Sequence, residues 1–181
     1  MSQSFEEAII RHCAATLAGH KCGSLFFHAS CTAEDIDSAN AAMNGKGVRV
    51  IPLRTCARGT LVYVLRPGML NERLARADVQ AFLRERGYER TDLESCIAML
   101  KSRVCPESFP HEIGVFLDYP LADVIAFIRN RGENCPLTGC WKAYTNEAAA
   151  RKTFALYRKC RDVYLRCYAR GYGVARLTVA A

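Results

Sequence analysis

The sequence lacks any apolar run of the length that a membrane span requires. A spanning helix needs about 20 consecutive, mostly apolar residues, and charged side chains interrupt the apolar runs of this 181-residue chain well before that length. The opening segment, MSQSFEEAIIRHC, has two adjacent acids and no apolar core of the signal-peptide type. We therefore expect a soluble, cytoplasmic protein that does not contact the membrane.

Paired Cys-x2-Cys motifs are also absent, although the chain contains ten cysteines. Without an export signal, these cysteines are expected to be free thiols, metal ligands or small core residues. The residues that come nearest to a metal cluster are His12, Cys13, His20, Cys22, His28 and Cys31. Cys135 and Cys140 could form half a zinc site, but no second close pair follows them. We predict no metal site.

Internal repeats, low-complexity segments and clear linkers are absent as well. Half of the residues are hydrophobic and 24% are charged, which is the composition of a globular protein rather than a disordered one. A chain of this length can bury a core without disulfides or metals. We predict a single α+β domain over residues 1–181, with an α-β-α-β-β part (1–66) and a mainly helical part (67–181).

Apolar runs in the first third predict a small mixed or antiparallel sheet of three to four strands. Two of these runs flank the segment 54–59, which predicts a hairpin with a loop of several residues. Pro52 cannot donate a ladder hydrogen bond, so its strand is expected to be an edge strand or to be bulged there. The predicted strands are 24–28, 48–54 and 60–65, with 141–145 as either a fourth strand or a lid.

Apolar residues at helical spacing predict several helices that cover the sheet. Ser4 with Glu7 has the signature of a capping box for the first helix, and Thr32 is a candidate N-cap for the second. Pro120 separates two further helices, 111–119 and 121–132. The remaining helices are expected within 69–77, 77–87, 92–105 and 146–170, with Cys105-Pro106 ending the third of these and 171–181 as a tail of uncertain order.

The net charge of +7 comes from the C-terminal part alone. Residues 1–140 contain 16 Lys and Arg and 16 Asp and Glu, whereas residues 141–181 contain 9 and 2. The pattern predicts one long basic C-terminal helix rather than a basic protein. Such a helix could contact nucleic acid or an acidic partner, or it could be a solvated face.

Four sequence blocks occur in a recognisable order. They are CAATLAGHKCGSLF (13–26), LVYVLRP (61–67), FPHEIGVFLDYPLADVIAFI (109–128) and GCWKAY (139–144) with a trailing Tyr157-Arg158-Lys159-Cys160. With these blocks the chain resembles a bacterial family of uncharacterised proteins, domain of unknown function family 3793. The resemblance covers nearly the whole chain and implies no activity or cofactor. This chain departs from the family pattern at Asp118, where glycine is usual, at Cys140, where tyrosine is expected, and at Ala143, where valine is expected.

Two sets of polar residues are candidates for function. His111 and Glu112 are adjacent, and a histidine beside a carboxylate can act as a general base; alternatively, Glu112 stabilises a helix N-terminus and His111 bonds locally. Basic and aromatic residues at the ends of predicted elements could line a pocket for an anionic ligand; alternatively, the lysines extend over the edge of the core. The candidate ligand-binding residues are Lys21, Arg66, Lys142 and Tyr144.

The leading hypothesis is therefore a protein that binds an anionic small ligand or a protein partner. One alternative is an enzyme that uses His111 and Glu112 with Lys21 or Lys142. Another is a nucleic-acid-binding regulator with a helix-turn-helix-like pair at 111–131, although Asp123 would oppose phosphate there.

Overall fold

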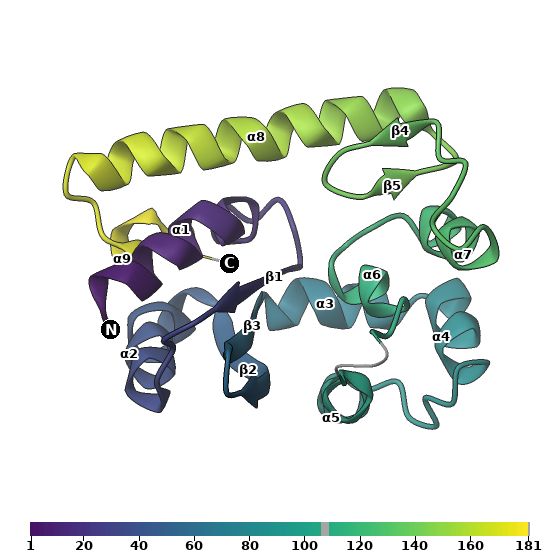
Figure 1. The fold of residues 1–181 in the computed structure, drawn as a ribbon, viewed down its shortest axis with the longest axis horizontal. Coiled ribbons are helices and arrows are strands. Elements are labelled where there is room, and N and C mark those ends of the chain that lie inside the picture. Colours follow the sequence, from purple (N-terminus) through teal and green to yellow (C-terminus); the bar gives the residue numbers. More distant parts are fainter. Residues whose placement is uncertain (106–108, 181) are drawn as a thin grey trace.

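The centre of the molecule is a three-stranded antiparallel sheet with the strand order β1-β3-β2. The computed structural model describes residues 1–105 and 109–180. It confirms the α+β class, and the sheet is antiparallel rather than mixed (Figure 1). The elements of the N-terminal part are α1 (Gln3–Leu17), β1 (Gly23–His28), α2 (Ala33–Met43), the 3-10 turn η1 (Asn44–Lys46), β2 (Arg49–Cys56) and β3 (Gly59–Leu65).

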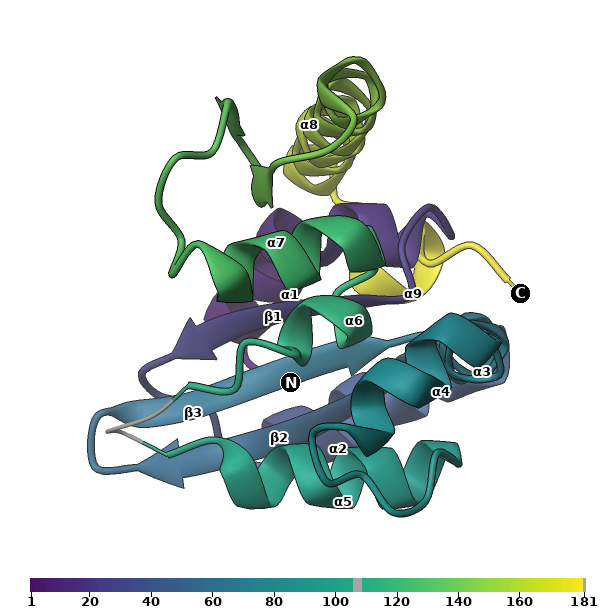
Figure 2. The ribbon, with the colours of Figure 1, turned by 90° about the vertical axis from the view of Figure 1, so that its right-hand side faces the viewer.

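Both faces of the sheet are buried. Alternate residues of each strand point to opposite sides, and each side packs into its own core cluster. On the central strand, Val62 and Val64 pack against α1 and α2, while Tyr63 and Leu65 pack against the helices that follow β3. Figure 2 shows these helices on the two sides of the sheet. Elements on the second side and beyond are α3 (Pro67–Leu74), α4 (Ala77–Arg84), α5 (Leu93–Arg103), α6 (Ile113–Phe116) and α7 (Leu121–Arg129).

The hairpin between β2 and β3 is tighter than the sequence predicted. Pairing continues to Cys56 opposite Gly59, so two residues form the turn and the expectation of a longer loop is wrong. The polar residues 54–56 belong to an edge strand whose outer side faces solvent, which is why they read as loop. The prediction for Pro52 is confirmed, since β2 is an edge strand and its register shifts between Pro52 and Arg54.

The predicted N-cap is wrong for the first helix and correct for the second. The prediction of Ser4 as the cap of the first helix is wrong: α1 begins at Gln3, and Ser2 precedes it without a side-chain cap. Phe5 is fully buried in the core, so packing places the first turn ahead of the expected cap. Thr32 is confirmed as the cap of α2, where it forms a capping box with Asp35.

The segment before Pro120 contains less helix than expected. The prediction of a helix over 111–119 is wrong, because α6 is a single turn of four buried residues. Asp118 follows it with a φ of 62°, in the left-handed region that glycine adopts most readily. The expected break at Cys105-Pro106 lies partly outside the described residues, since α5 ends at Arg103 and Pro106 is not among them.

The Trp141 segment does not extend the main sheet. It forms a separate two-stranded sheet from β4 (Leu137–Thr138) and β5 (Lys142–Ala143), so a fourth strand of the main sheet is not formed. Trp141 and Ala143 of this hairpin pack against Phe154 of the long helix α8 (Glu147–Ala169). The expected long basic helix is confirmed, and it lies along α1 (Figure 1).

The C-terminal segment is packed onto the fold rather than free. It forms the short helix α9 (Val174–Leu177), and Val174 and Leu177 are buried beside α1 and α2. Val179 N donates a hydrogen bond to Leu17 O at the end of α1. In the described part of the chain, no helix is long and apolar enough to cross a membrane.

Candidate functional site

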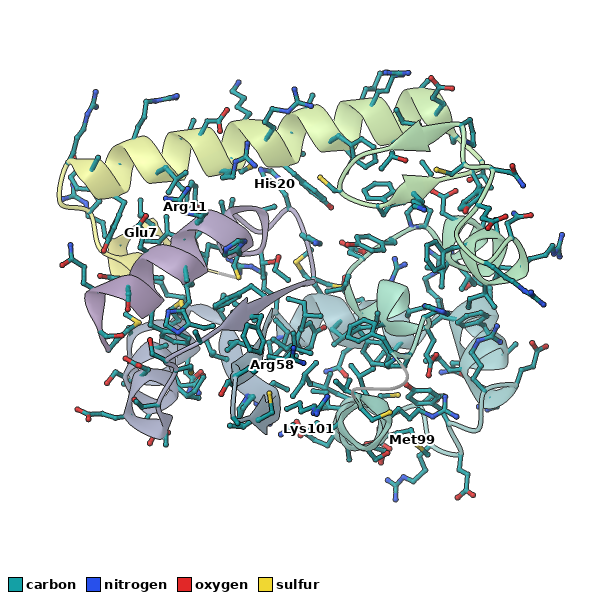
Figure 3. The ribbon with its side chains drawn as sticks, in the orientation of Figure 1. Glu7, Arg11, His20, Arg58, Met99 and Lys101 are labelled. Carbon is teal, nitrogen blue, oxygen red and sulfur yellow. The ribbon has the colours of Figure 1, made fainter. Side chains whose placement is uncertain are left out.

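A basic cavity of about 430 Å³ lies between α1, α8 and the turn that contains Gly139 and Cys140. Its charged lining residues are all cations, and no Asp or Glu lines it within the described residues. Figure 3 shows Arg11 on the side of α1 that faces α8, with His20 just after the C-terminal end of α1. The polar lining side chains are Arg11, His12, Lys21, Ser24, Cys140, Tyr157, Arg158 and Arg161.

Lys21 is the most deeply placed of these cations. Gly19, with a φ of 77°, ends α1 and turns the chain toward β1, so Lys21 enters the interior and is only 8% exposed. Its Nζ lies 5.3 Å from the ring centroid of Tyr119 and 5.6 Å from that of Tyr157. Among the residues described here, none accepts a hydrogen bond from this amine. Lys21 is thus a buried cation held by two aromatic rings and by no anion.

The electrostatic surroundings of Lys21 leave its charge uncompensated. Burial lowers the pKa of the Lys21 amine, against the opposing influence of Cys13, Cys140, Cys22 and Asp118. Burial in turn raises the pKa of each of these three thiols, so they are neutral at pH 7. Asp118 is the one carboxylate of that group, and its Oδ1 is paired with Arg73 Nη1 at 3.0 Å.

The outer cations of the cavity are more exposed and partly paired. Arg11 bonds Glu7 at 2.5 Å, and Arg161 lies 3.5 Å from Asp162. Arg158 is exposed and has no ion pair within the described residues. The pKa of His12 is lowered, mainly by partial burial and to a smaller extent by the charges of Arg11 and Arg161. The cavity therefore has a buried amine at its base and guanidinium groups at its mouth.

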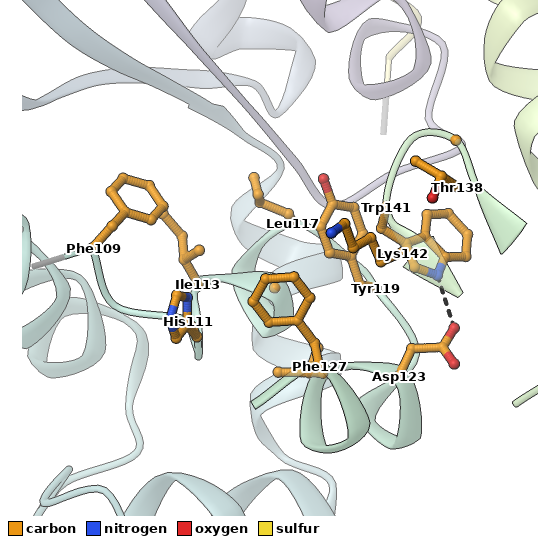
Figure 4. A pocket seen from close by; sticks show the side chains of 13 residues that line it. Phe109, His111, Ile113, Leu117, Tyr119, Asp123, Phe127, Thr138, Trp141 and Lys142 are labelled. Carbon is orange, nitrogen blue, oxygen red and sulfur yellow. Dashed lines mark hydrogen bonds between the residues drawn. The ribbon is translucent and has the colours of Figure 1, made fainter. Parts of the chain in front are cut away.

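A second, apolar cavity of about 360 Å³ lies on the other side of the Gly139 turn. Gly139 lines both cavities, so the β4–β5 hairpin separates them. Figure 4 shows His111, Phe127 and Trp141 around the second cavity, with Asp123 bonded to Trp141. The ring of His111 meets that of Phe127 edge-on at 5.2 Å.

Asp123 of α7 fixes the position of the hairpin that separates the cavities. Its carboxylate, 3% exposed, accepts hydrogen bonds from Trp141 Nε1 at 2.8 Å, from Tyr144 N at 2.9 Å, and from Thr145 N at 2.9 Å and Oγ1 at 2.8 Å. Burial alone would raise the pKa of Asp123, but these bonds hold it below its usual value. The residue that was expected to repel phosphate is thus an internal anchor.

The four candidate ligand residues do not meet in one cavity. Lys21 lines the basic cavity, and Lys142 lines the apolar one, where its Nζ donates to Gly132 O at 2.6 Å. Tyr144 OH donates to Glu133 O at 3.0 Å. Arg66 is 3% exposed and donates to Thr16 O, Leu17 O and Val179 O. These contacts make Arg66 a clamp between the end of α1 and the C-terminal segment.

The adjacent residues His111 and Glu112 line one cavity but differ in burial. Glu112 is buried and pairs with Arg103 at 2.6 Å, and it accepts a hydrogen bond from Tyr88 OH at 3.3 Å. His111 is exposed and also lines the apolar cavity, and both residues line a further cavity of about 500 Å³ together with Arg103. Lys21 lines a different cavity from His111. An enzyme that uses this pair with a lysine stays a prediction.

The structure also bears on two other interpretations of the sequence, the helix-turn-helix motif and the metal cluster. A helix-turn-helix motif uses a first helix to support the recognition helix, and α6 is a single turn. For metals, no group of three or more His, Cys, Asp and Glu residues is placed to hold an ion within residues 1–105 and 109–180. Cys13 and Cys22 are free thiols in the core.

A family model described as Protein of unknown function (DUF3793) matches residues 9–178. The chain belongs to this family. No curated protein and no solved structure matches the chain. The DUF3793 match begins within α1 and ends after α9, and it includes every residue that lines the basic cavity.

Sequence reasoning missed most of the basic cavity of this DUF3793 protein. Arg11 and Arg161 were not singled out in the sequence, and nothing local in the sequence brings α8 beside α1. One signal was present, because Tyr157 and Arg158 open the short block that trails GCWKAY. Those two residues line the cavity together with Lys21.

Proposed function

We propose that this DUF3793 protein binds a small anionic ligand, through a phosphate or carboxylate group, in the cavity lined by Lys21. The observation that carries the proposal is the largely buried Lys21 side chain, whose amine reaches this cavity and has no hydrogen-bond acceptor among the described residues. The proposal narrows the hypothesis of an anionic ligand to one place in the fold.

The energetic argument rests on the cost of burying an unpaired charge. Removing an ammonium group from water costs several kcal/mol in a real protein, and contacts with two aromatic rings recover about 0.5–2 kcal/mol each. A bound anion would supply the missing partner and the missing acceptors. Lysine is a common phosphate-binding residue, acting as a point charge.

The mouth of the cavity supports the same class of ligand. Arg158 and Arg161 lie one helical turn apart on α8 and both line the cavity, as does Arg11 across from them on α1. Guanidinium groups bind carboxylates and phosphates in a two-pronged geometry. The surplus positive charge of residues 141–181 would also raise the rate at which anions reach this site.

The test is isothermal titration calorimetry with pyrophosphate and, separately, malonate, at fixed ionic strength. Arg158→Gln should weaken binding of the preferred anion by about tenfold or more, equivalent to the loss of one charge-assisted hydrogen bond. Lys159→Gln is the matched control: Lys159 is exposed, is adjacent in sequence and does not line the cavity. Equal weakening by both variants, or no binding of either anion, would contradict the proposal.

A further inference from the structure

We infer that Lys21 is a nucleophilic amine that forms an imine with an aldehyde or ketone carrying an anionic group. This inference rests on the proposed function, because the cations of the cavity would hold the anionic end of the compound. It goes further by assigning a covalent step to one atom, Lys21 Nζ.

The placement of Lys21 differs from that of the other lysines. Lys46 donates to Ala175 O at 2.6 Å and to Thr178 O at 2.8 Å, and Lys142 donates to Gly132 O. The remaining three lysines, Lys101, Lys152 and Lys159, are exposed on helices. Lys21 alone combines burial, an unoccupied amine and a position on the wall of a cavity, within the part of the chain that the structure describes.

Burial shifts the amine of Lys21 toward its neutral, nucleophilic form. An amine attacks a carbonyl only when it is unprotonated, and enzymes obtain such lysines by removing them from water or placing them near other cations. Burial lowers the pKa of Lys21, against the opposing influence of three thiols and Asp118. Asp118 favours the ammonium form of Lys21, but its carboxylate also pairs with Arg73 and accepts a hydrogen bond from the backbone N–H of Cys22.

The step is balanced without a cofactor or a redox partner. The nitrogen lone pair of Lys21 attacks the carbonyl carbon and gives a carbinolamine. The carbinolamine then loses its hydroxyl group and a nitrogen-bound proton as one water molecule, which leaves a C=N bond. His12 lines the same cavity and has a lowered pKa, so its neutral imidazole is available to carry the proton.

The experiment traps the imine on the intact protein. Wild-type protein is incubated with glyoxylate and cyanoborohydride at neutral pH, and peptide mass spectrometry then locates carboxymethyl groups on lysines. A lowered pKa raises the neutral fraction of the Lys21 amine at neutral pH. We therefore expect Lys21 to be modified several-fold faster than Lys159. Acetaldehyde at the same concentration, which lacks the anionic group, should lose this preference.

Two further arms separate this inference from the proposed function. Lys21→Arg keeps the positive charge and cannot form an imine, so it should remove the fast modification while the remaining lysines react as before; circular dichroism checks its fold. Pyrophosphate, which has no carbonyl, should slow modification of Lys21 by competition. Modification spread evenly over exposed lysines would overturn the inference, and if pyrophosphate still binds, the proposed function stands. If neither pyrophosphate nor malonate binds, the proposed function fails as well.

Discussion

Replacing Asp123 with asparagine should destabilise the protein by about 3 kcal/mol, because one amide cannot satisfy the donors that the carboxylate accepts. Oδ1 accepts three hydrogen bonds from Tyr144 and Thr145, and Oδ2 accepts one from Trp141. In Asp123→Asn, the amide oxygen can keep the first three. The amide nitrogen then takes the place of Oδ2, which lies 2.8 Å from Trp141 Nε1 in the wild type. Two hydrogen-bond donors face each other there, so the Trp141 N–H loses its acceptor.

The magnitude follows from the change at each oxygen. Leaving the buried Trp141 N–H without an acceptor costs about 1–3 kcal/mol. Converting three charge-assisted bonds into neutral ones weakens each of them, since bonds to charged groups are roughly twice as strong as neutral ones. Together these changes give about 3 kcal/mol. With an m-value of roughly 2 kcal/mol/M, the urea midpoint should fall by about 1.5 M.

The assay is urea unfolding followed by the fluorescence of Trp141, which is the only tryptophan of the sequence. Asp37→Asn is the matched control, since Asp37 is exposed on α2 and undergoes the same chemical change. A midpoint for Asp123→Asn that lies within error of the Asp37→Asn midpoint would refute the role of Asp123 as the anchor of the β4–β5 hairpin.

Three further predictions follow from the same contacts. Lys21→Met should stabilise the protein by about 1–2 kcal/mol in thermal unfolding, because methionine fills the space between the tyrosine rings without a buried charge; a destabilised variant would contradict this. Because the folded-state pKa of Lys21 lies below the value of about 10.4 expected when unfolded, the unfolded chain binds more protons between these two values, so stability should rise with pH across that window. Subtracting the pH profile of stability of Lys21→Met from that of the wild type isolates this contribution, and identical profiles would contradict it. Arg66→Gln should cost about 2–4 kcal/mol and speed amide hydrogen exchange around Val179, since three carbonyl contacts are lost; unchanged exchange there would rule out the clamp.

The sequence predicted the elements whose signals are local. The apolar runs of β2 and β3, the cap at Thr32 and the bulge at Pro52 each depend on a few neighbouring residues. The errors arose where packing overrides such signals, as at Phe5, whose burial places the start of α1 before Ser4.

The candidate site was harder to predict because it is built from distant segments. Lys21 was identified as a candidate ligand residue, but its aromatic contacts come from Tyr119 and Tyr157, which lie about 100 and 136 positions further along the chain. Likewise, Asp123 was expected only to oppose phosphate, and its hydrogen bond to Trp141 forms because the Trp141 segment folds over it. Neither contact leaves a periodic pattern in the sequence.

The most direct measurement of the central claim is a pyrophosphate titration of protein whose lysines carry a 13C label, followed by NMR of the lysine side chains. The six lysines of the chain give separate probes of their own surroundings. We predict that the Lys21 side-chain signals move and saturate while those of Lys159 stay in place. Signals that all drift together with added salt, or a Lys21 signal that does not move, would contradict anion binding at this site.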